Sequence, residues 1–276
     1  MRSSIPFAAA KMHTVECLSH GVPVRITVGS DELLAALPQR LPFATEMNTA
    51  PVDGAASFTL LPLDHDHGYM FFAGSELVLE SAEGEPVLEE FARELMIHVA
   101  NFCPDRVFVH AGVVGWNGRA LVMPGTSFAG KTTLTAALVR AGATYLSDEY
   151  AVVDEAGWVH PYPRDLQMRE PGKSEQRSTP VESLQGRATT TPMRVAQVVF
   201  ARYEPGAAWD PQPITPGIAV LEMLRHSIPV QRIPGRVLCT LKAMIEGATA
   251  WSSARDEADA VAESLLRPQA DAAMSG

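Results

Sequence analysis

Apolar and polar positions alternate in two short runs near the start of the chain, at residues 13–18 and 22–28. Ser19-His20-Gly21 separates the runs and has the composition of a tight turn, so the pattern predicts a β-hairpin. Asp31 is expected to cap a short helix over residues 32–37 that ends at Pro38. Further short strands are predicted at residues 58–62, 69–72 and 75–80.

A longer helix is predicted from Pro86 to Asn101. Its apolar side chains recur at helical spacing and share one face, at Leu88, Phe91, Leu95 and Val99. With the strands before it, this helix predicts a small N-terminal α+β lobe over residues 1–104.

From Arg106 onward the apolar runs are denser, and we expect a second unit over residues 105–267. Residues 107–114 are interpreted as a pair of strands, and residues 116–119 as a hairpin turn. Residues 171–193 are polar, rich in Pro, Gly, Ser and Thr, and without period, which predicts a flexible loop or lid. The other predicted elements are strands at 119–123, 144–147, 151–154 and 195–200, and helices at 134–141, 218–225, 236–246 and 258–266; residues 268–276 are expected to be a disordered tail.

A glycine-rich motif lies between the strand at 119–123 and the helix that follows it. Gly125-Thr126-Ser127-Phe128-Ala129-Gly130-Lys131-Thr132 reads G-x-x-x-x-G-K-T. In a strand–loop–helix arrangement, backbone N–H groups and the helix N-terminus face one anion. We therefore predict a nucleotide phosphate site in which Lys131 reaches the β- and γ-phosphates and the Thr132 hydroxyl ligates Mg²⁺. The residues expected to bind the nucleotide are Gly125, Thr126, Ser127, Ala129, Gly130, Lys131, Thr132 and Thr133. The alternative is a glycine-rich turn that matches the motif by chance.

Two carboxylates, Asp148 and Glu149, directly follow the strand at 144–147. Ligands bind at this end of the strands in open α/β sheets. One carboxylate can hold Mg²⁺ and the other can accept a proton from a hydroxyl; the alternative is that both cap a surface turn. His110 precedes the motif strand and is a candidate phosphate-binding or base-tuning residue, or a structural histidine.

The charged segment 161–170 offers further candidates. Arg164 or Arg169 could clamp a phosphate, and Glu170 could join the metal shell. An exposed edge strand with a salt-bridged face is an equally good interpretation. Asp64-His65-Asp66-His67 contains metal-ligating residue types, but with no third ligand at a suitable spacing we interpret it as a solvated loop.

Composition and charge limit the classes of protein to which this chain can belong. The chain is 46% hydrophobic and 20% charged, which is ordinary for a globular protein. Its net charge of −10 and lack of a Lys/Arg block disfavour nucleic-acid binding. No apolar run approaches the ~18 residues of a membrane helix, and no signal peptide is evident. The 3 cysteines are widely separated, so we expect a soluble, cytoplasmic protein without disulfides.

The segment His110–Val114, the glycine motif and Tyr145-Leu146-Ser147-Asp148-Glu149 together resemble the catalytic domain of HPr kinase/phosphorylase. That family shares its nucleotide site with ATP-dependent phosphoenolpyruvate carboxykinase. The resemblance implies an α/β fold with α+β elements, in which a small N-terminal lobe is followed along the chain by a P-loop kinase core. It also implies that His110 helps to bind phosphate, that Asp148 is the general base, and that Glu149 and Glu170 help to hold Mg²⁺.

The chain departs from the family in several places. The family's acidic pair is typically Asp-Asp, whereas the second residue here is Glu149, and the motif ends in Thr132-Thr133 as in the carboxykinases. The N-terminal lobe does not match that of HPr kinase. The glycine-containing segment associated with phosphorolysis is not evident. The chain more closely resembles the shorter HPr-kinase-related proteins, some of which act on peptides.

These inferences predict an ATP- and Mg²⁺-dependent kinase that transfers the γ-phosphoryl group to a hydroxyl, with serine of a protein or peptide as the expected acceptor. A small-molecule kinase and a nucleotide-binding accessory or regulatory protein without transfer activity remain as alternatives. Family members are often oligomeric, so a homo-oligomer is a further expectation from the resemblance. The sequence is silent on the acceptor's identity, on reversibility and on the choice between ATP and another nucleotide.

Overall fold

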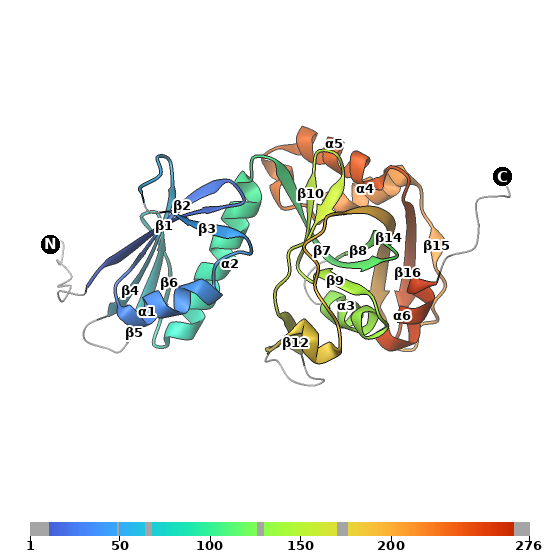
Figure 1. Cartoon of the computed structure of the whole chain (residues 1–276), viewed down its shortest axis with the longest axis horizontal. Coiled ribbons are helices and arrows are strands. Elements are labelled where there is room, and N and C mark those ends of the chain that lie inside the picture. The colour runs from blue at the N-terminus through green and yellow to red at the C-terminus, as the bar shows by residue number, and fades with distance from the viewer. Residues whose placement is uncertain (1–10, 49, 64–67, 126–129, 170–175, 268–276) are drawn as a thin grey trace. The chain divides into compact units, whose positions relative to one another are not determined.

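The computed structural model describes residues 11–48, 50–63, 68–125, 130–169 and 176–267 (Figure 1). The chain divides into two compact units, Met1–Pro104 and Asp105–Gly276. Antiparallel and parallel strand pairs occur with helices packed on the sheets, so the fold is mixed α/β and consistent with the α+β class. Several predicted features lie outside the described residues: Thr126, Ser127, Ala129, Glu170, the segment 64–67, residues 171–175 of the predicted loop and the tail 268–276.

In the first unit, one sheet has the strand order β3-β1-β2-β4-β5-β6. The predicted hairpin is confirmed, because β1 and β2 pair antiparallel from His13↔Val28 to Ser19↔Val22. The long helix α2 (Gly84–Phe102) buries the predicted face, and its Phe91 meets Phe58 and Phe71 edge to face. The strands are β1 (His13–Ser19), β2 (Val22–Val28), β3 (Thr45–Asn48), β4 (Ala56–Leu63), β5 (Gly68–Ala73) and β6 (Glu76–Ser81).

Two local expectations in this unit were wrong. The helix α1 (Asp31–Ala36) is capped by Ser30, whose Oγ accepts a hydrogen bond from the backbone N–H of Leu33 at 3.1 Å; Asp31 is instead the first helical residue. Pro38 lies within a 3₁₀ turn, η1 (Leu37–Gln39), which continues from α1. The strand β3 was not predicted, since its side chains are largely exposed and carry no apolar alternation.

The second unit is built on a sheet with the order β11-β10-β7-β8-β14-β16-β15, to which β9 adds beside β7. β14 runs parallel to both β8 and β16, whereas β7 runs antiparallel to its neighbours. The strands are β7 (Arg106–Trp116), β8 (Arg119–Pro124), β9 (Thr144–Ser147), β10 (Tyr150–Asp154), β11 (Trp158–His160), β12 (Leu166–Arg169), β13 (Gln176–Thr179), β14 (Met193–Tyr203), β15 (Gln212–Pro213) and β16 (Thr249–Arg255).

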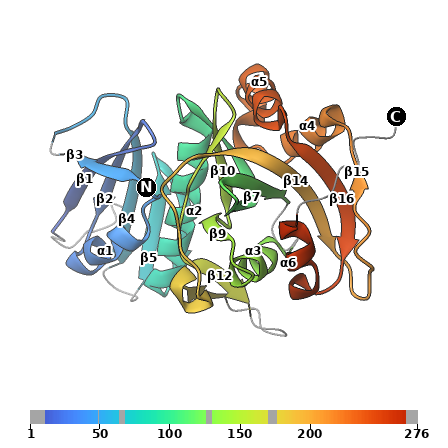
Figure 2. The same ribbon diagram turned by 45° about the vertical axis from the view of Figure 1, so that its right-hand side comes forward.

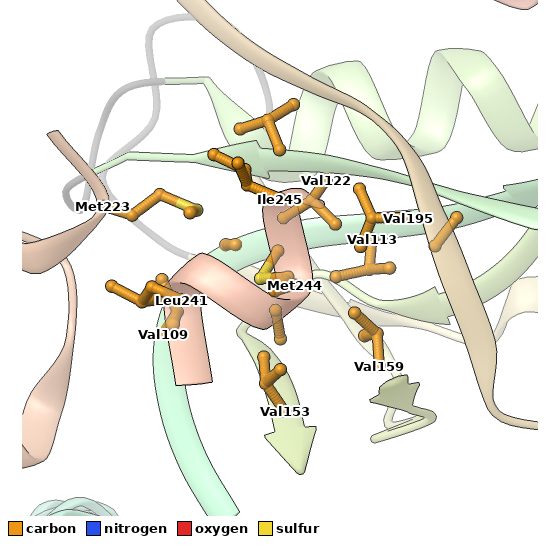
Figure 3. Packing of buried hydrophobic residues seen from close by; sticks show 14 of the residues in the cluster. Val109, Val113, Val122, Val153, Val159, Val195, Met223, Leu241, Met244 and Ile245 are labelled. Carbon is orange, nitrogen blue, oxygen red and sulfur yellow. The ribbon is translucent and has the colours of Figure 1, made fainter. Parts of the chain in front are cut away.

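Helices cover both faces of this sheet (Figure 2). On one face α3 (Lys131–Arg140) packs with α6 (Ala258–Leu266) against side chains such as Val114 and Leu121. The other face carries α4 (Pro216–Leu224) and α5 (Pro234–Ile245). Figure 3 shows Leu241 and Met244 of α5 among the valines of the strands. Burial on both faces explains the dense apolar runs that begin at Arg106.

Two predictions in the second unit need correction, and one strand was missed. Residues 107–114 belong to a single strand, β7, rather than to a strand pair; its first half pairs with β10 and its second half with β8. The predicted loop 171–193 contains β13, which pairs with β12, and a 3₁₀ turn, η2 (Val181–Leu184). The strand β16 was missed because Thr-Ala-Trp-Ser-Ser-Ala-Arg lacks a clear apolar pattern. Within the described ranges, no helix combines the length and apolar composition needed to cross a membrane.

Candidate functional site

The two ends of the glycine motif are held by the elements beside it. Gly125 directly follows β8, and its backbone N–H donates to the carbonyl of His110 on β7 at 3.2 Å. Gly130 precedes α3 with φ of 77°, in the left-handed region that favours glycine. Its carbonyl accepts the first helical hydrogen bond, from the N–H of Leu134 at 3.0 Å. The ends of the motif thus have the strand-to-helix arrangement that the sequence predicts.

Lys131 and Thr132 form the first turn of α3. The Lys131 side chain is buried, and this burial lowers the pKa of its ammonium although the nearby carboxylates of Glu149 and Asp148 oppose the shift. The Thr132 hydroxyl donates to Oδ2 of Asp148 at 3.2 Å. Thr133, which was also expected to bind the nucleotide, is exposed on the helix. Thr132 therefore links the glycine motif to the acidic pair.

Asp148 is only 2% exposed. Besides Thr132, its neighbours are the Tyr145 hydroxyl, 2.9 Å from Oδ1, and the Arg164 guanidinium, whose Nε is 3.8 Å from the same oxygen. Burial raises the pKa of Asp148 above its usual value, even though Arg164 and the two hydroxyls favour the charged form. Asp148 is thus a buried carboxylate with an increased affinity for a proton.

Glu149 has a different environment, although it is the next residue. Its Oε1 is 3.2 Å from Nε2 of His110, and its Oε2 accepts a hydrogen bond from Arg164 at 2.9 Å. Burial alone would raise the pKa of Glu149, but the His110 hydrogen bond and the charges of Arg164, His110 and Lys131 hold it below the usual value. The two adjacent carboxylates are therefore shifted in opposite directions, which is how neighbouring acids acquire different roles.

The strands explain how these groups meet. His110 of β7 lies opposite Tyr150 of β10 in the antiparallel pairing, so Glu149, one residue earlier, comes beside the His110 imidazole. At the end of β9, the buried Ser147 Oγ accepts hydrogen bonds from the backbone N–H groups of Glu149 at 3.1 Å and Tyr150 at 3.0 Å. This turn directs the acidic pair toward the start of α3.

The structure brings together most of the predicted site residues that it describes: His110, Lys131, Thr132, Asp148 and Glu149. Arg164, one of the two candidates for a phosphate clamp, lies against the acidic pair. Tyr145 and His226 were not identified as site residues. The carbonyl of His226 accepts from the N–H of His110 at 2.7 Å, and burial followed by the charges of Lys131 and His110 lowers the pKa of the His226 imidazole. An alternation pattern cannot distinguish Tyr145 from any other buried strand residue.

The donor set fits a magnesium ion that is shared with a nucleotide. Mg²⁺ typically takes one or two carboxylates, phosphate oxygens and several waters rather than an all-protein cage. Thr132 and the carboxylates of Asp148 and Glu149 supply oxygen donors of this kind at one place. Among the described residues, no group of three or more His, Cys, Asp or Glu side chains is arranged to hold a metal by itself.

The site is therefore a buried lysine and a half-buried threonine at the start of a helix, joined to two carboxylates of opposite pKa shift and to a histidine. Neither a protein-family model nor a curated protein sequence matches the chain.

Proposed function

We propose that this protein is an ATP- and Mg²⁺-dependent kinase that transfers the γ-phosphoryl group to a hydroxyl, with serine of a protein or peptide as the acceptor. The observation that carries the proposal is the hydrogen bond from the Thr132 hydroxyl to Asp148, because it joins the end of a G-x-x-x-x-G-K-T motif to a carboxylate. The sequence resemblance to HPr kinase/phosphorylase supports the same reaction. Phosphoryl transfer depends on positioning and electrostatic stabilisation, and this site offers both.

Each side chain has a role in this proposal. Lys131 and His110 bind the phosphates, and Thr132 and Glu149, together with Glu170, hold Mg²⁺. The bound ion would neutralise charge that develops on the phosphates. The lowered pKa of Glu149 suits a metal ligand, since it stays ionised. The raised pKa of Asp148 suits a general base, since a more basic carboxylate takes a proton from a hydroxyl more readily.

An acceptor hydroxyl must be able to hydrogen-bond to Asp148, and the contacts of Tyr145 allow this. The Tyr145 hydroxyl is 2.9 Å from Oδ1 of Asp148 and also 2.9 Å from the carbonyl oxygen of Arg164. A carboxylate oxygen can accept more than one hydrogen bond, so Oδ1 can accept from an acceptor hydroxyl while the tyrosine proton is shared between Oδ1 and the carbonyl.

The proposal is tested with Lys131→Ala and Asp148→Asn. Candidate peptides and small hydroxyl compounds are incubated with MgATP, and a phosphate adduct is sought by intact mass. We expect Asp148→Asn to reduce transfer by about 10²–10⁴-fold, the usual effect of a positioned general base, and Lys131→Ala to abolish it. Asp154→Asn is the matched control, because Asp154 on β10 pairs with His160 rather than with the site.

The possible outcomes distinguish the proposed kinase from its alternatives. Transfer that persists in Asp148→Asn contradicts the base assignment. Phosphorylation of small molecules but not peptides changes the acceptor class. ATP binding without turnover on any acceptor favours a nucleotide-binding accessory or regulatory protein.

A further inference from the structure

A buried arginine from a distant strand contacts the last glycine of the motif. Arg255 is the final residue of β16 and is 2% exposed. Its Nη2 donates to the carbonyl oxygen of Gly130 at 2.9 Å, and its Nη1 donates to the carbonyl oxygen of Asp256 at 2.8 Å. The guanidinium carbon lies 5.5 Å from the ring centroid of Tyr203, which pairs with Arg255 across β14 and β16. These three contacts hold the Arg255 side chain against the start of α3.

The contact brings the arginine close to the α-carbon of the glycine. A Cβ on Gly130 would lie 2.5 Å from Nη2 of Arg255, closer than Cβ atoms approach other heavy atoms. The left-handed φ of Gly130 favours glycine at this position, and a larger residue would in addition displace the end of the Arg255 side chain. Because the Gly130 carbonyl also accepts the first hydrogen bond of α3, Arg255 fixes the point where the motif becomes helix.

The charge of Arg255 lacks a direct counter-ion. Its hydrogen-bond partners are backbone carbonyls, and within the described residues no carboxylate lies within ion-pair distance of it. Its Nε is buried and finds no acceptor in the same part of the chain. Burial accordingly lowers the pKa of this guanidinium, in spite of the negative charge of Glu257. A buried charge without a counter-ion is costly even when it is hydrogen-bonded, so an anion that came near would relieve this cost.

We propose that Arg255 is a positioning residue of the nucleotide site, holding Gly130 in the phosphate-binding conformation and adding positive charge behind the N-terminus of α3. This inference rests on the proposed function. The ligand that it implies carries several negative charges, as the phosphates of a nucleotide do. Arg255, the buried Lys131 and the positive end of α3 then form one anion-binding cluster drawn from two segments 125 residues apart.

The test measures MgATP binding by isothermal titration calorimetry on the full chain. Arg255→Gln is expected to weaken the affinity by about tenfold to a hundredfold, the usual effect of losing a hydrogen bond from a charged group. Arg255→Lys keeps the charge but loses the forked donors, so an intermediate loss is expected. Arg202→Gln is the control, because it removes the same charge from β14 one residue before Tyr203, where the Arg202 side chain is 78% exposed.

A second readout needs no nucleotide. If Arg255 holds the Gly130 carbonyl, Arg255→Gln should increase hydrogen exchange at the Leu134 amide, which donates to the same oxygen. If Arg255→Gln does not fold, both the MgATP affinity and the hydrogen exchange are measured on Arg255→Lys.

The possible results distinguish this inference from the proposed function. If wild-type affinity and exchange persist in both Arg255 variants while Lys131→Ala loses binding, the role of Arg255 is refuted and the nucleotide site stands. An equal loss in Arg202→Gln also refutes it, since the effect would then be one of net charge. If the wild-type chain does not bind MgATP, the proposed function fails and the role of Arg255 fails with it.

Discussion

The imidazole of His98 shows how one half-buried side chain can make the stability of a unit depend on pH. His98 on α2 stacks on Phe102 with ring centroids 4.5 Å apart and meets Phe58 edge to face. Burial among these rings lowers its pKa below the usual value. The unfolded chain then binds more protons than the folded chain below a pH of about 6.5, so the stabilisation is present above that pH and is lost as the pH falls.

We therefore expect the free energy of unfolding to decrease as the pH is lowered from about 7 to 5. Urea denaturation of the wild type and of His98→Gln across this range measures the effect. The variant should be less stable at pH 7 and should show a shallower dependence on pH. An identical slope in the two proteins would assign the pH dependence to other groups.

At the residue scale, the sequence predicted side chains that lie close together in the chain or carry a motif. Lys131 and Thr132 are neighbours in the motif, and the Asp148-Glu149 pair directly follows a short strand, so they could be named as candidates without the fold. Arg255 could not be inferred, since nothing in a strand of weak pattern indicates contact with Gly130 across 125 residues. Contacts of this kind arise from the order of the strands in the sheet, which cannot be deduced from a single sequence.

At the scale of elements, the approach of α3 to β7 depends on a glycine. A Cβ on Gly112 of β7 would lie 2.4 Å from Oγ1 of Thr135 on α3. Gly112→Ala should therefore push the helix from the strand and destabilise the protein by about 1–3 kcal/mol, as overpacking of cores does. Chemical denaturation gives this difference directly.

A double-mutant cycle tests the stated cause. The Thr135 hydroxyl is buried without a hydrogen-bond partner among the described residues, so Thr135→Ala removes the clashing atom without breaking a bond. The double variant should recover part of the stability lost in Gly112→Ala, which would appear as a favourable coupling energy. Strictly additive effects would show that the clash is with a different group.

Elements were predictable where the apolar period was strong. The helices α2, α4, α5 and α6 and the hairpin β1–β2 correspond closely to their predicted ranges, because each buries one regular face. Two strands without a regular apolar face were missed: β3 is largely exposed, and in β16 buried and exposed side chains do not alternate, although it lies between β14 and β15. The prediction of two strands over residues 107–114 was wrong because β7 is one strand that changes its pairing partner along its length without a turn.

At the scale of the whole molecule, the described residues of the candidate site belong to one compact unit. Its described residues, from His110 to Arg255, all belong to the unit Asp105–Gly276. That unit has its own buried clusters on both faces of its sheet. A unit with its own core and complete site is expected to fold and bind without the remainder of the chain.

We accordingly predict that a fragment of residues 105–276 binds MgATP with an affinity within about threefold of the full chain, a difference of about 0.7 kcal/mol. Circular dichroism establishes that the fragment is folded, and calorimetry compares the two affinities. Lys131→Ala in the fragment serves as the control, since it should remove binding there as in the full chain. A folded fragment that has lost its affinity would place part of the nucleotide site on residues 1–104. A fragment with full affinity that no longer phosphorylates an acceptor would instead assign acceptor recognition to those residues, because the fragment retains all the residues that we propose to bind phosphate.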